Sequence, residues 1–245
     1  MVHSNRNRAI GALVFAGVVL QACVSTTTSP TPQPSPQAAP QPKVEKISYS
    51  QAVSRLAPIK ARMEPIVERE CKARTTSGTN CDYLISVDKE ETKIANAYQT
   101  LDKNGRPLII FTAPLIAETR NAHELAFVMG HEAAHHIGGH IARQQTNASF
   151  GALAGGLLIA AAGGDASSVQ AAMDLGATVG ARSYSKQHEL EADSLGTVLT
   201  HKSGYDPLIG VNFFERTPDP GNQFLGTHPP NSARINVVRQ TAAGL

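Results

Sequence analysis

Apolar residues recur every three to four positions between residues 52 and 67, with charged residues between them. This spacing predicts an amphipathic helix at the start of the folded part of the chain. Pro58 and Pro65 fall inside the pattern. Because proline lacks a backbone N–H and clashes with the preceding turn, we expect these two residues to kink or split the helix.

Three short apolar runs follow, at residues 83–87, 94–101 and 107–112. Runs of this length between polar segments predict strands. Asn104 and Gly105 lie between the second and third runs, and an Asn-Gly pair in that place favours a hairpin. The first half of the folded part is therefore expected to supply one helix and a small sheet.

The second half has the pattern of helices. One is predicted from Asn121, which can cap the helix with Glu124 as its partner, to Gly138. Another is predicted from Ser185 to Gly204. Together these elements predict an α+β fold that is mainly helical, with a sheet of about three strands.

Residues 151–164 contain only Gly, Ala, Leu and Ile. The run is too short to cross a bilayer, because a spanning helix needs about 20 apolar residues. One interpretation is a mobile helix that touches a membrane or gates a site. The other, which we favour, is a buried or loosely packed helix.

The composition is that of a folded protein, with 41% hydrophobic and 17% charged residues. It excludes a disordered charged tail and a protein that spans a membrane many times. The formal net charge of +2 gives no indication of nucleic-acid binding. Three cysteines are too few for a small disulfide-rich scaffold.

The first residues have the pattern of a secretion signal. Arg6 and Arg8 precede an apolar run at residues 9–20. The sequence Leu-Gln-Ala-Cys at residues 20–23 resembles a bacterial lipoprotein box, which implies cleavage before Cys23 and a lipid on its thiol. An ordinary secreted protein with a chance cysteine is the alternative.

The signal is followed by a segment that cannot form a core, since residues 24–42 are rich in Ser, Thr, Pro and Gln. Extended, such a tether reaches about 60 Å. We divide the chain into a signal peptide (1–22), a lipidated Cys23 with its tether (23–43) and one domain (44–245). Val24, rather than Asp, follows the cysteine. By resemblance to sorted lipoproteins, this implies the periplasmic face of the outer membrane rather than the inner membrane.

Export to an oxidising compartment also favours a disulfide. Cys71 and Cys81 are the two cysteines of the domain. A flexible Thr-Thr-Ser-Gly stretch lies between them and can close the loop. We predict that they pair; two free buried thiols are the alternative.

A metal-binding pattern lies inside the helix predicted from Asn121. His131 and His135 are four residues apart and share one helix face, so both imidazoles can bind one ion. Glu132 lies beside that ion and can take a proton from water. This is the H-E-x-x-H arrangement of zinc peptidases.

A catalytic zinc ion takes three protein ligands, so a third one is required. The metzincin continuation fails because Ile141 stands where a histidine is needed. His136 and His140 have ligand spacing, but two glycines interrupt the helix between them. We expect these two histidines at the helix end or on the surface.

Glu189 is the better candidate for the third ligand. Asp193 lies four residues further on, on the same helix face, where it can accept the free N–H of a liganding histidine. Glu191 points about 200° away from Glu189 and should face elsewhere.

These motifs resemble the gluzincin metallopeptidases of the HtpX and CAAX-prenyl-protease type. The H-E-x-x-H motif is followed by Glu-Leu-Glu-Ala-Asp at residues 189–193. Asn-Ala-Tyr at 96–98 and Thr-His-Pro at 227–229 match two further family motifs. Among the family's branches, the chain is similar to the small periplasmic lipoproteins of the LoiP and YcaL kind.

The resemblance implies a zincin-type domain with one zinc ion (Zn2+) per chain. It makes His131, His135 and Glu189 the zinc ligands and Glu132 the catalytic base. Asp193 becomes the partner of a liganding histidine. His228, in the Thr-His-Pro motif, remains open: it either caps the zinc ion, donates to a developing oxyanion, or only shapes its loop.

The function implied is a zinc-dependent endopeptidase, anchored by lipid to the outer membrane. Its substrates would be unfolded or misassembled envelope proteins, so that it serves protein quality control. The alternative is a non-catalytic periplasmic lipoprotein that acts as a chaperone or holds a partner. An intact Glu132 argues against this alternative, because a purely structural metal site needs no base.

Overall fold

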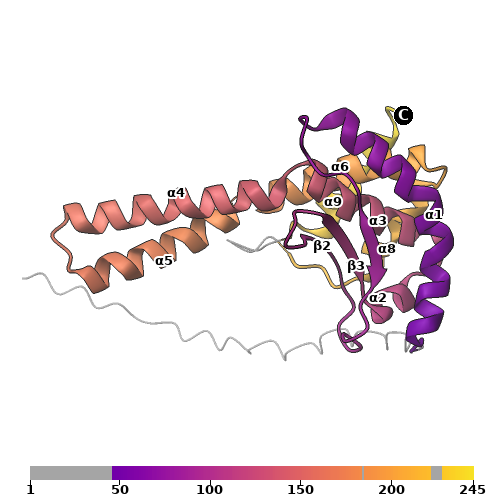
Figure 1. Ribbon diagram of the computed structural model, residues 1–245, viewed down its shortest axis with the longest axis horizontal. Coiled ribbons are helices and arrows are strands. Elements are labelled where there is room, and N and C mark those ends of the chain that lie inside the picture. Colours follow the sequence, from indigo (N-terminus) through magenta and orange to yellow (C-terminus); the bar gives the residue numbers. More distant parts are fainter. Residues whose placement is uncertain (1–45, 184, 222–227) are drawn as a thin grey trace, which may run out of the picture. The chain divides into compact units, whose positions relative to one another are not determined.

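The computed structural model describes residues 46–183, 185–221 and 228–245. The chain divides into two compact units, Met1–Pro42 and Lys43–Leu245, and every described residue belongs to the second. The predicted signal peptide, the predicted lipidation site Cys23 and the whole predicted tether lie outside the described residues, as does Thr227. Figure 1 shows the elements of the second unit.

The described part of the chain opens with one long helix, α1 (Tyr49–Arg74). Ser48 and Gln51 cap its first turn, since the side chain of each accepts a hydrogen bond from the backbone N–H of the other. The expectation that Pro58 and Pro65 could split the helix is wrong, because both lie inside it. The buried apolar face continues across both prolines, and its packing keeps the helix continuous.

The sheet has three strands in the order β1–β3–β2 within the described residues. β1 (Leu84–Val87) runs parallel to β3 (Pro107–Phe111), and β2 (Ala97–Leu101) runs antiparallel to it. In the turn between β2 and β3, Asp102 accepts hydrogen bonds from two backbone N–H groups and Gly105 adopts a φ of 78°. The predicted strands and hairpin are therefore confirmed, and β2 lies at an edge of the sheet.

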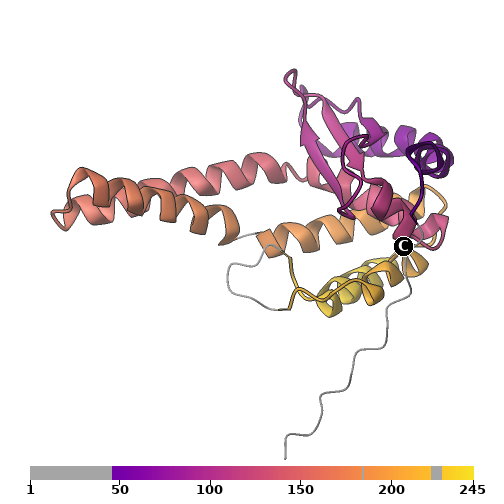
Figure 2. The same cartoon turned by 90° about the horizontal axis from the view of Figure 1, so that it is seen from below.

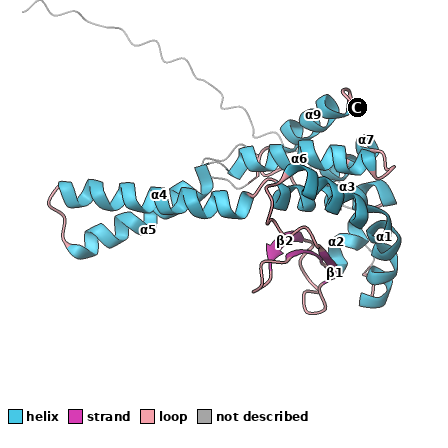
Figure 3. Cartoon of the chain, turned by 45° about the horizontal axis from the view of Figure 1, so that its top comes forward, coloured by secondary structure: helices cyan, strands magenta, loops and turns pink. Residues whose placement is uncertain are grey.

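The helix α3 (Ala122–Ile137) lies at the centre of the unit, between the sheet and α6 (Ser185–Lys202), as Figure 3 shows. The short helix α2 (Ala113–Glu118) leads into it from β3. α3 and α6 approach closely where two glycines face each other. A Cβ atom on Gly196 would lie 2.9 Å from the backbone nitrogen of His131, and one on Gly130 would lie 2.8 Å from the carbonyl oxygen of Gly196. Only glycine permits this contact.

Three helices close the chain: α7 (Pro207–Gly210), α8 (Asn212–Arg216) and α9 (Asn231–Ala242). The sequence patterns did not predict them. α7 and α8 are single turns, too short for a helical period to be visible. α9 packs against α6.

Between α3 and α6 the chain forms a helical hairpin of α4 (His140–Ala161) and α5 (Ala166–Ser183), which extends away from the other elements of this unit (Figures 1 and 2). Glycines line the seam, and a Cβ on Gly151 would overlap the carbonyl oxygen of Gly176. We favoured a buried or loosely packed helix at residues 151–164; the expected burial is wrong, since most of these residues are exposed. Among the described residues, no helix is long and apolar enough to cross a membrane.

A disulfide joins Cys71, near the end of α1, to Cys81, with 5.8 Å between their Cα atoms. The prediction of this pair is confirmed. Two residues later, the Tyr83 hydroxyl donates a hydrogen bond to the carbonyl oxygen of Ala133 in α3. The chain leading into β1 is thereby fixed to α1 and to α3. The α+β fold, mainly helical with a three-stranded sheet, is confirmed.

Candidate metal centre

The helix α3 begins and ends where the sequence predicted. The Asn121 side chain accepts a hydrogen bond from the backbone N–H of Glu124, which caps the helix. The reciprocal half of the capping box is absent from this part of the structure: the Glu124 carboxylate instead accepts from the backbone of Arg120 and pairs with Arg216. At the other end, Gly139 adopts a left-handed φ of 62° and turns the chain into α4.

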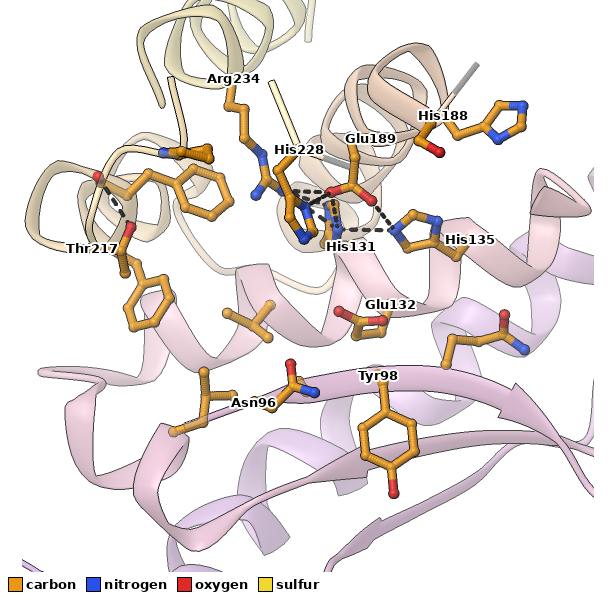
Figure 4. A pocket seen from close by; sticks show the side chains of 18 of the residues that line it. Asn96, Tyr98, His131, Glu132, His135, His188, Glu189, Thr217, His228 and Arg234 are labelled. Atoms are coloured by element: carbon orange, nitrogen blue, oxygen red, sulfur yellow. Dashed lines mark hydrogen bonds and ion pairs between the residues drawn. The ribbon is translucent and has the colours of Figure 1, made fainter. Parts of the chain in front are cut away.

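Three side chains form a group that could hold a metal ion: His131 and His135 from α3, and Glu189 from α6. The Nε2 atoms of the two histidines lie 3.0 Å apart. The Glu189 oxygens lie 3.5 Å and 3.4 Å from the Nε2 atoms of His131 and His135. Figure 4 shows the two imidazoles pointing from α3 toward the carboxylate.

The spacing of these atoms fits a zinc ion. Bonds of about 2.0–2.1 Å at tetrahedral angles place two ligand atoms roughly 3.3 Å apart. The two Nε2 atoms here are 3.0 Å apart, and each lies 3.4 or 3.5 Å from one of the two Glu189 oxygens. Two imidazoles and one carboxylate are also a donor set of catalytic zinc sites, which keep a fourth position open.

His131 is oriented by a buried ion pair behind it. Its Nδ1 lies 2.9 Å from Oδ1 of Asp193. Arg234 from α9 donates to both oxygens of that carboxylate, over 2.7 Å each, and its guanidinium lies 3.8 Å above the Phe214 ring. With Asp193 accepting the Nδ1 proton, Nε2 of His131 has its lone pair free for a metal ion.

The sequence analysis assigned no role to Arg234. It gave no signal that separated Arg234 from other arginines of the chain, apart from its place after the Thr-His-Pro motif. The structure brings it to the site because α9 packs against α6.

His135 has a partner that the sequence analysis placed elsewhere. His140 was expected at the helix end or on the surface, but it is buried, with its Nδ1 2.8 Å from Nδ1 of His135. The left-handed turn at Gly139 brings it back toward α3. His188 stacks on it with 4.6 Å between ring centroids, and Nε2 of His140 lies 3.3 Å from Glu191.

Glu191 lies two residues after Glu189 on the same helix and was expected to face away from it. It does so, and pairs with Arg143 over 2.6 Å. Through His140, it nonetheless contacts the ring nitrogen of His135 that points away from Glu189. His136, the other histidine set aside above, binds the carbonyl oxygen of Asn80 over 2.7 Å and takes no part in the group.

The protonation of the three candidate ligands follows from burial and from their neighbours. Burial and the neighbouring His131 lower the pKa of His135 to about 3, so this ring is neutral. Burial works against a charge on Glu189, but contacts with His131 and His228 hold its pKa well below its usual range. Burial also opposes a charge on His131, yet hydrogen bonds to Asp193 and Glu189 raise its pKa to about 10. Metal binding would therefore release a proton from His131.

Glu132 lies beside this group and faces the other way. In Figure 4 its carboxylate lies between α3 and β2, while the two histidines point toward α6. It borders a pocket of about 720 Å³ whose wall includes Asn96 and Gln99. Burial raises the pKa of Glu132 to about 7. A carboxylate with a pKa near neutrality can both take up and release a proton.

His228 also lines this pocket, from the chain segment that precedes α9. Its Nδ1 lies 3.1 Å from Oε2 of Glu189, and its side chain is 55% exposed. It therefore contacts a candidate ligand while its ring remains open to the pocket.

The sequence was compared with protein-family models and with curated proteins. The model of Peptidase family M48 matches residues 59–242. The chain is 32% identical to the beta-barrel assembly-enhancing protease of Escherichia coli K12 over 148 residues, which is 55% of this chain and 30% of the relative. The corresponding protease of Yersinia pestis is 30% identical over 173 residues, with 65% of this chain and 34% of the relative covered.

A relative from a plant has a lower sequence identity. The mitochondrial metalloendopeptidase OMA1 of Arabidopsis thaliana is 28% identical over 137 residues, which is 54% of this chain and 27% of that protein. The chain thus spans about a third or less of the length of these relatives. The family model, in contrast, covers well over half of the chain and includes every candidate metal ligand. The chain therefore belongs to Peptidase family M48.

Proposed function

We propose that this chain is a zinc-dependent endopeptidase of the bacterial cell envelope, with one zinc ion held by His131, His135 and Glu189. The observation that carries the proposal is the group formed by these three side chains, with Glu132 beside it on the pocket side. Membership of a peptidase family and relatives named as proteases support it.

The roles of the side chains follow from their positions. A bound zinc ion supplies a Lewis acid that acidifies water and polarises a carbonyl group. Glu132 takes the proton from the attacking water and passes it to the leaving amine. Asp193, held by Arg234, keeps His131 in the tautomer that leaves Nε2 free.

His228 has two candidate roles, which predict opposite effects of its removal. As a fourth zinc ligand it would close the open position, so the enzyme would be more active without it. As a donor to the developing oxyanion, its loss would lower turnover by about 10²-fold. Its contact with Glu189 places it close enough to the group for either role.

The edge strand β2 offers a binding site for an extended peptide. Residues 95–99 line the pocket that Glu132 also borders. β2 pairs with β3 on one side only in the described sheet, so the backbone groups of its other edge, apart from the Gln99 N–H that bonds to Glu132, are available to a substrate strand. Recognition through the backbone suits a peptidase that acts on unfolded chains of varied sequence.

We further propose that the substrates are unfolded or misassembled envelope proteins and that the enzyme serves protein quality control. The names of the relatives from Escherichia coli and Yersinia pestis support this assignment. A lipid on Cys23 would hold the domain at the periplasmic face of the outer membrane, and the lipoprotein box at residues 20–23 supports that location.

The experiment that tests the proposal compares wild-type protein with Glu132→Gln on casein, an unfolded protein. The variant should retain zinc and its fold but cleave about 10² to 10⁴ times more slowly, because only the proton acceptor is removed. Glu215→Gln, whose side chain is 51% exposed and does not line the pocket, is the control and should cleave at nearly the wild-type rate. Equal cleavage by Glu132→Gln, or a zinc-loaded wild type that leaves casein intact, would contradict the peptidase and favour a partner-holding lipoprotein.

A further inference from the structure

The hairpin of α4 and α5 has two outer faces of opposite character. The outer face of α4 carries Phe150, Leu153, Leu157 and Leu158, and between 56% and 70% of each residue is exposed. At about 100° per residue these four side chains fall within one half of the helix circumference. Between residues 150 and 161, Ala154, Ala160 and Ala161 are the other exposed positions of that half of the helix. This apolar face of α4 has no partner among the described residues.

The outer face of α5 is polar. Ser167, Gln170, Asp174 and Thr178 are exposed and recur every three to four residues. The Gln170 amide donates a hydrogen bond to Asp174 over 2.8 Å. The apolar residues Leu175 and Val179 lie on the flank of α5, away from the centre of this polar stripe.

The seam between the helices fixes these two faces relative to each other. A Cβ on Gly155 would overlap the carbonyl oxygen of Ala172, and one on Gly180 would overlap that of Asn147. The helices therefore touch along their backbones and cannot rotate independently. The hairpin as a whole is amphipathic: the outer face of α4 is apolar and the outer face of α5 carries polar side chains.

We propose that the apolar face of α4 lies in the interfacial region of a lipid bilayer, with α5 on the water side. Between Arg143 and Arg182 the ionisable side chains are Asp165, at the tip of the hairpin, and Asp174, on the polar face. The apolar face thus carries no charge and no group that would specify a polar partner, which matches the acyl chains of a membrane. The length of the hairpin allows it to lie along the surface, and no described helix could cross.

The chain that precedes the described residues supplies a second argument. If residues 24–42 form the extended tether expected from their composition, their reach of about 60 Å would allow the domain to contact the bilayer that holds its lipid. This argument rests on the proposed lipid anchor, whereas the polarity of the two faces does not.

Contact with a bilayer would have a consequence for the site. α4 begins at His140, which contacts His135, and α5 ends directly before α6, which carries Glu189. A hairpin lying on the membrane would therefore set the orientation of the pocket relative to the surface.

The test uses the full chain with Cys23→Ser, which removes the lipid and leaves the disulfide cysteines paired. A single new cysteine is placed on each face, Leu157→Cys or Gln170→Cys, and labelled with an environment-sensitive fluorophore. With vesicles of phosphatidylcholine, we expect a blue shift and quenching by lipid-attached quenchers at position 157 and neither at position 170. Because no charge is involved, the signal should be the same at low and high salt.

A second set of variants measures binding itself. Leu153→Gln with Leu157→Gln and Leu158→Gln should lower the vesicle partition coefficient by about 10-fold or more, because three large apolar side chains are lost. The double variant Ser167→Gln, Thr178→Gln on α5 is the control, and its vesicle partition coefficient should equal that of the parent. Circular dichroism checks that each variant is folded. All variants keep the apolar run at residues 9–20, so differences between them in vesicle binding do not come from that run.

Three results would overturn the proposal. The first is no spectral shift at position 157, and the second is an equal shift at both positions. The third is a shift in the absence of vesicles together with a doubled molecular mass, which would show that a second copy of the chain covers the face. Glu132→Gln should bind vesicles like its parent. A variant that loses cleavage but still binds vesicles therefore tests the proposed peptidase activity. A variant that loses vesicle binding but still cleaves tests the proposed membrane contact of the hairpin.

Discussion

At the scale of single residues, the candidate donor set is held by partners from three helices, α4, α6 and α9. His131 is backed by Asp193, and Asp193 by Arg234. His135 is backed by His140, and His140 by Glu191. Each imidazole thus has one nitrogen directed to the candidate metal position and the other engaged.

Glu189 and Glu191 allow a direct test of the ligand assignment, because they lie on one helix and differ in direction. Glu189→Ala should lower the affinity for zinc well beyond the 10- to 100-fold that is typical for loss of an outer partner. Glu191→Ala should have an effect of about that smaller size, through His140. Competition with a chromophoric chelator measures both, and equal losses in the two variants would contradict the assignment.

Arg234 should contribute strongly to stability. Its partner Asp193 is fully buried, so Arg234→Ala removes the bidentate partner of this carboxylate and leaves it with His131. We expect the free energy of unfolding in urea to fall by about 3–5 kcal/mol. Arg239→Ala in the same helix is the control: that side chain is 60% exposed and pairs with Glu215 at 3.7 Å, so little change is expected. Similar losses in both variants would show that the buried pair has no special role.

The candidate ligands His131 and His135 could be chosen from the sequence because i, i+4 spacing on a helix puts them on one face, and the structure brings them together with Glu189. Arg234 and His140 could not be predicted in the same way. Arg234 reaches the site through the packing of α9 on α6, and His140 through one left-handed turn at Gly139. Both positions depend on tertiary contacts, which produce no periodic pattern in the sequence.

At the scale of elements, the site depends on how closely α3 approaches α6. Gly196→Ala would place a Cβ 2.9 Å from the backbone nitrogen of His131, so the two helices must separate. We expect a loss of about 1–3 kcal/mol in the free energy of unfolding, together with weaker zinc binding. Gly244→Ala is the control, because its nearest neighbour would lie at an ordinary 3.5 Å. Unchanged zinc binding in Gly196→Ala would show that the ligands adjust independently of this crossing.

The elements were predicted with uneven success, for physical reasons. α3 and the strands have clear periods and end signals, and all are confirmed. The hairpin is the main error. A run of only Gly, Ala, Leu and Ile is apolar on every side, so its sequence cannot tell a buried helix from one that exposes its apolar face.

At the scale of the whole molecule, the proposed lipid on Cys23 and the proposed contact of the hairpin are two separate attachments. Cys23→Ser should abolish incorporation of radiolabelled palmitate and leave the precursor uncut, while the purified variant still cleaves casein. When residues 1–22 are also removed from this variant, residual, reversible association with membranes is expected from the hairpin. Labelling of the Cys23→Ser variant by palmitate would contradict the lipoprotein assignment.

The place of the hairpin along the chain has one more consequence. Both of its ends lie at the site, and α3 and α6 contact each other without it. The turn at its tip, where Gly163 adopts a φ of 82°, is exposed. A protease that cut there would divide the donor set between two polypeptides, with two histidines on one and the carboxylate on the other. The fragments would remain joined by the packing of α3 on α6, so the covalent link between the two halves of the centre is dispensable once the chain has folded.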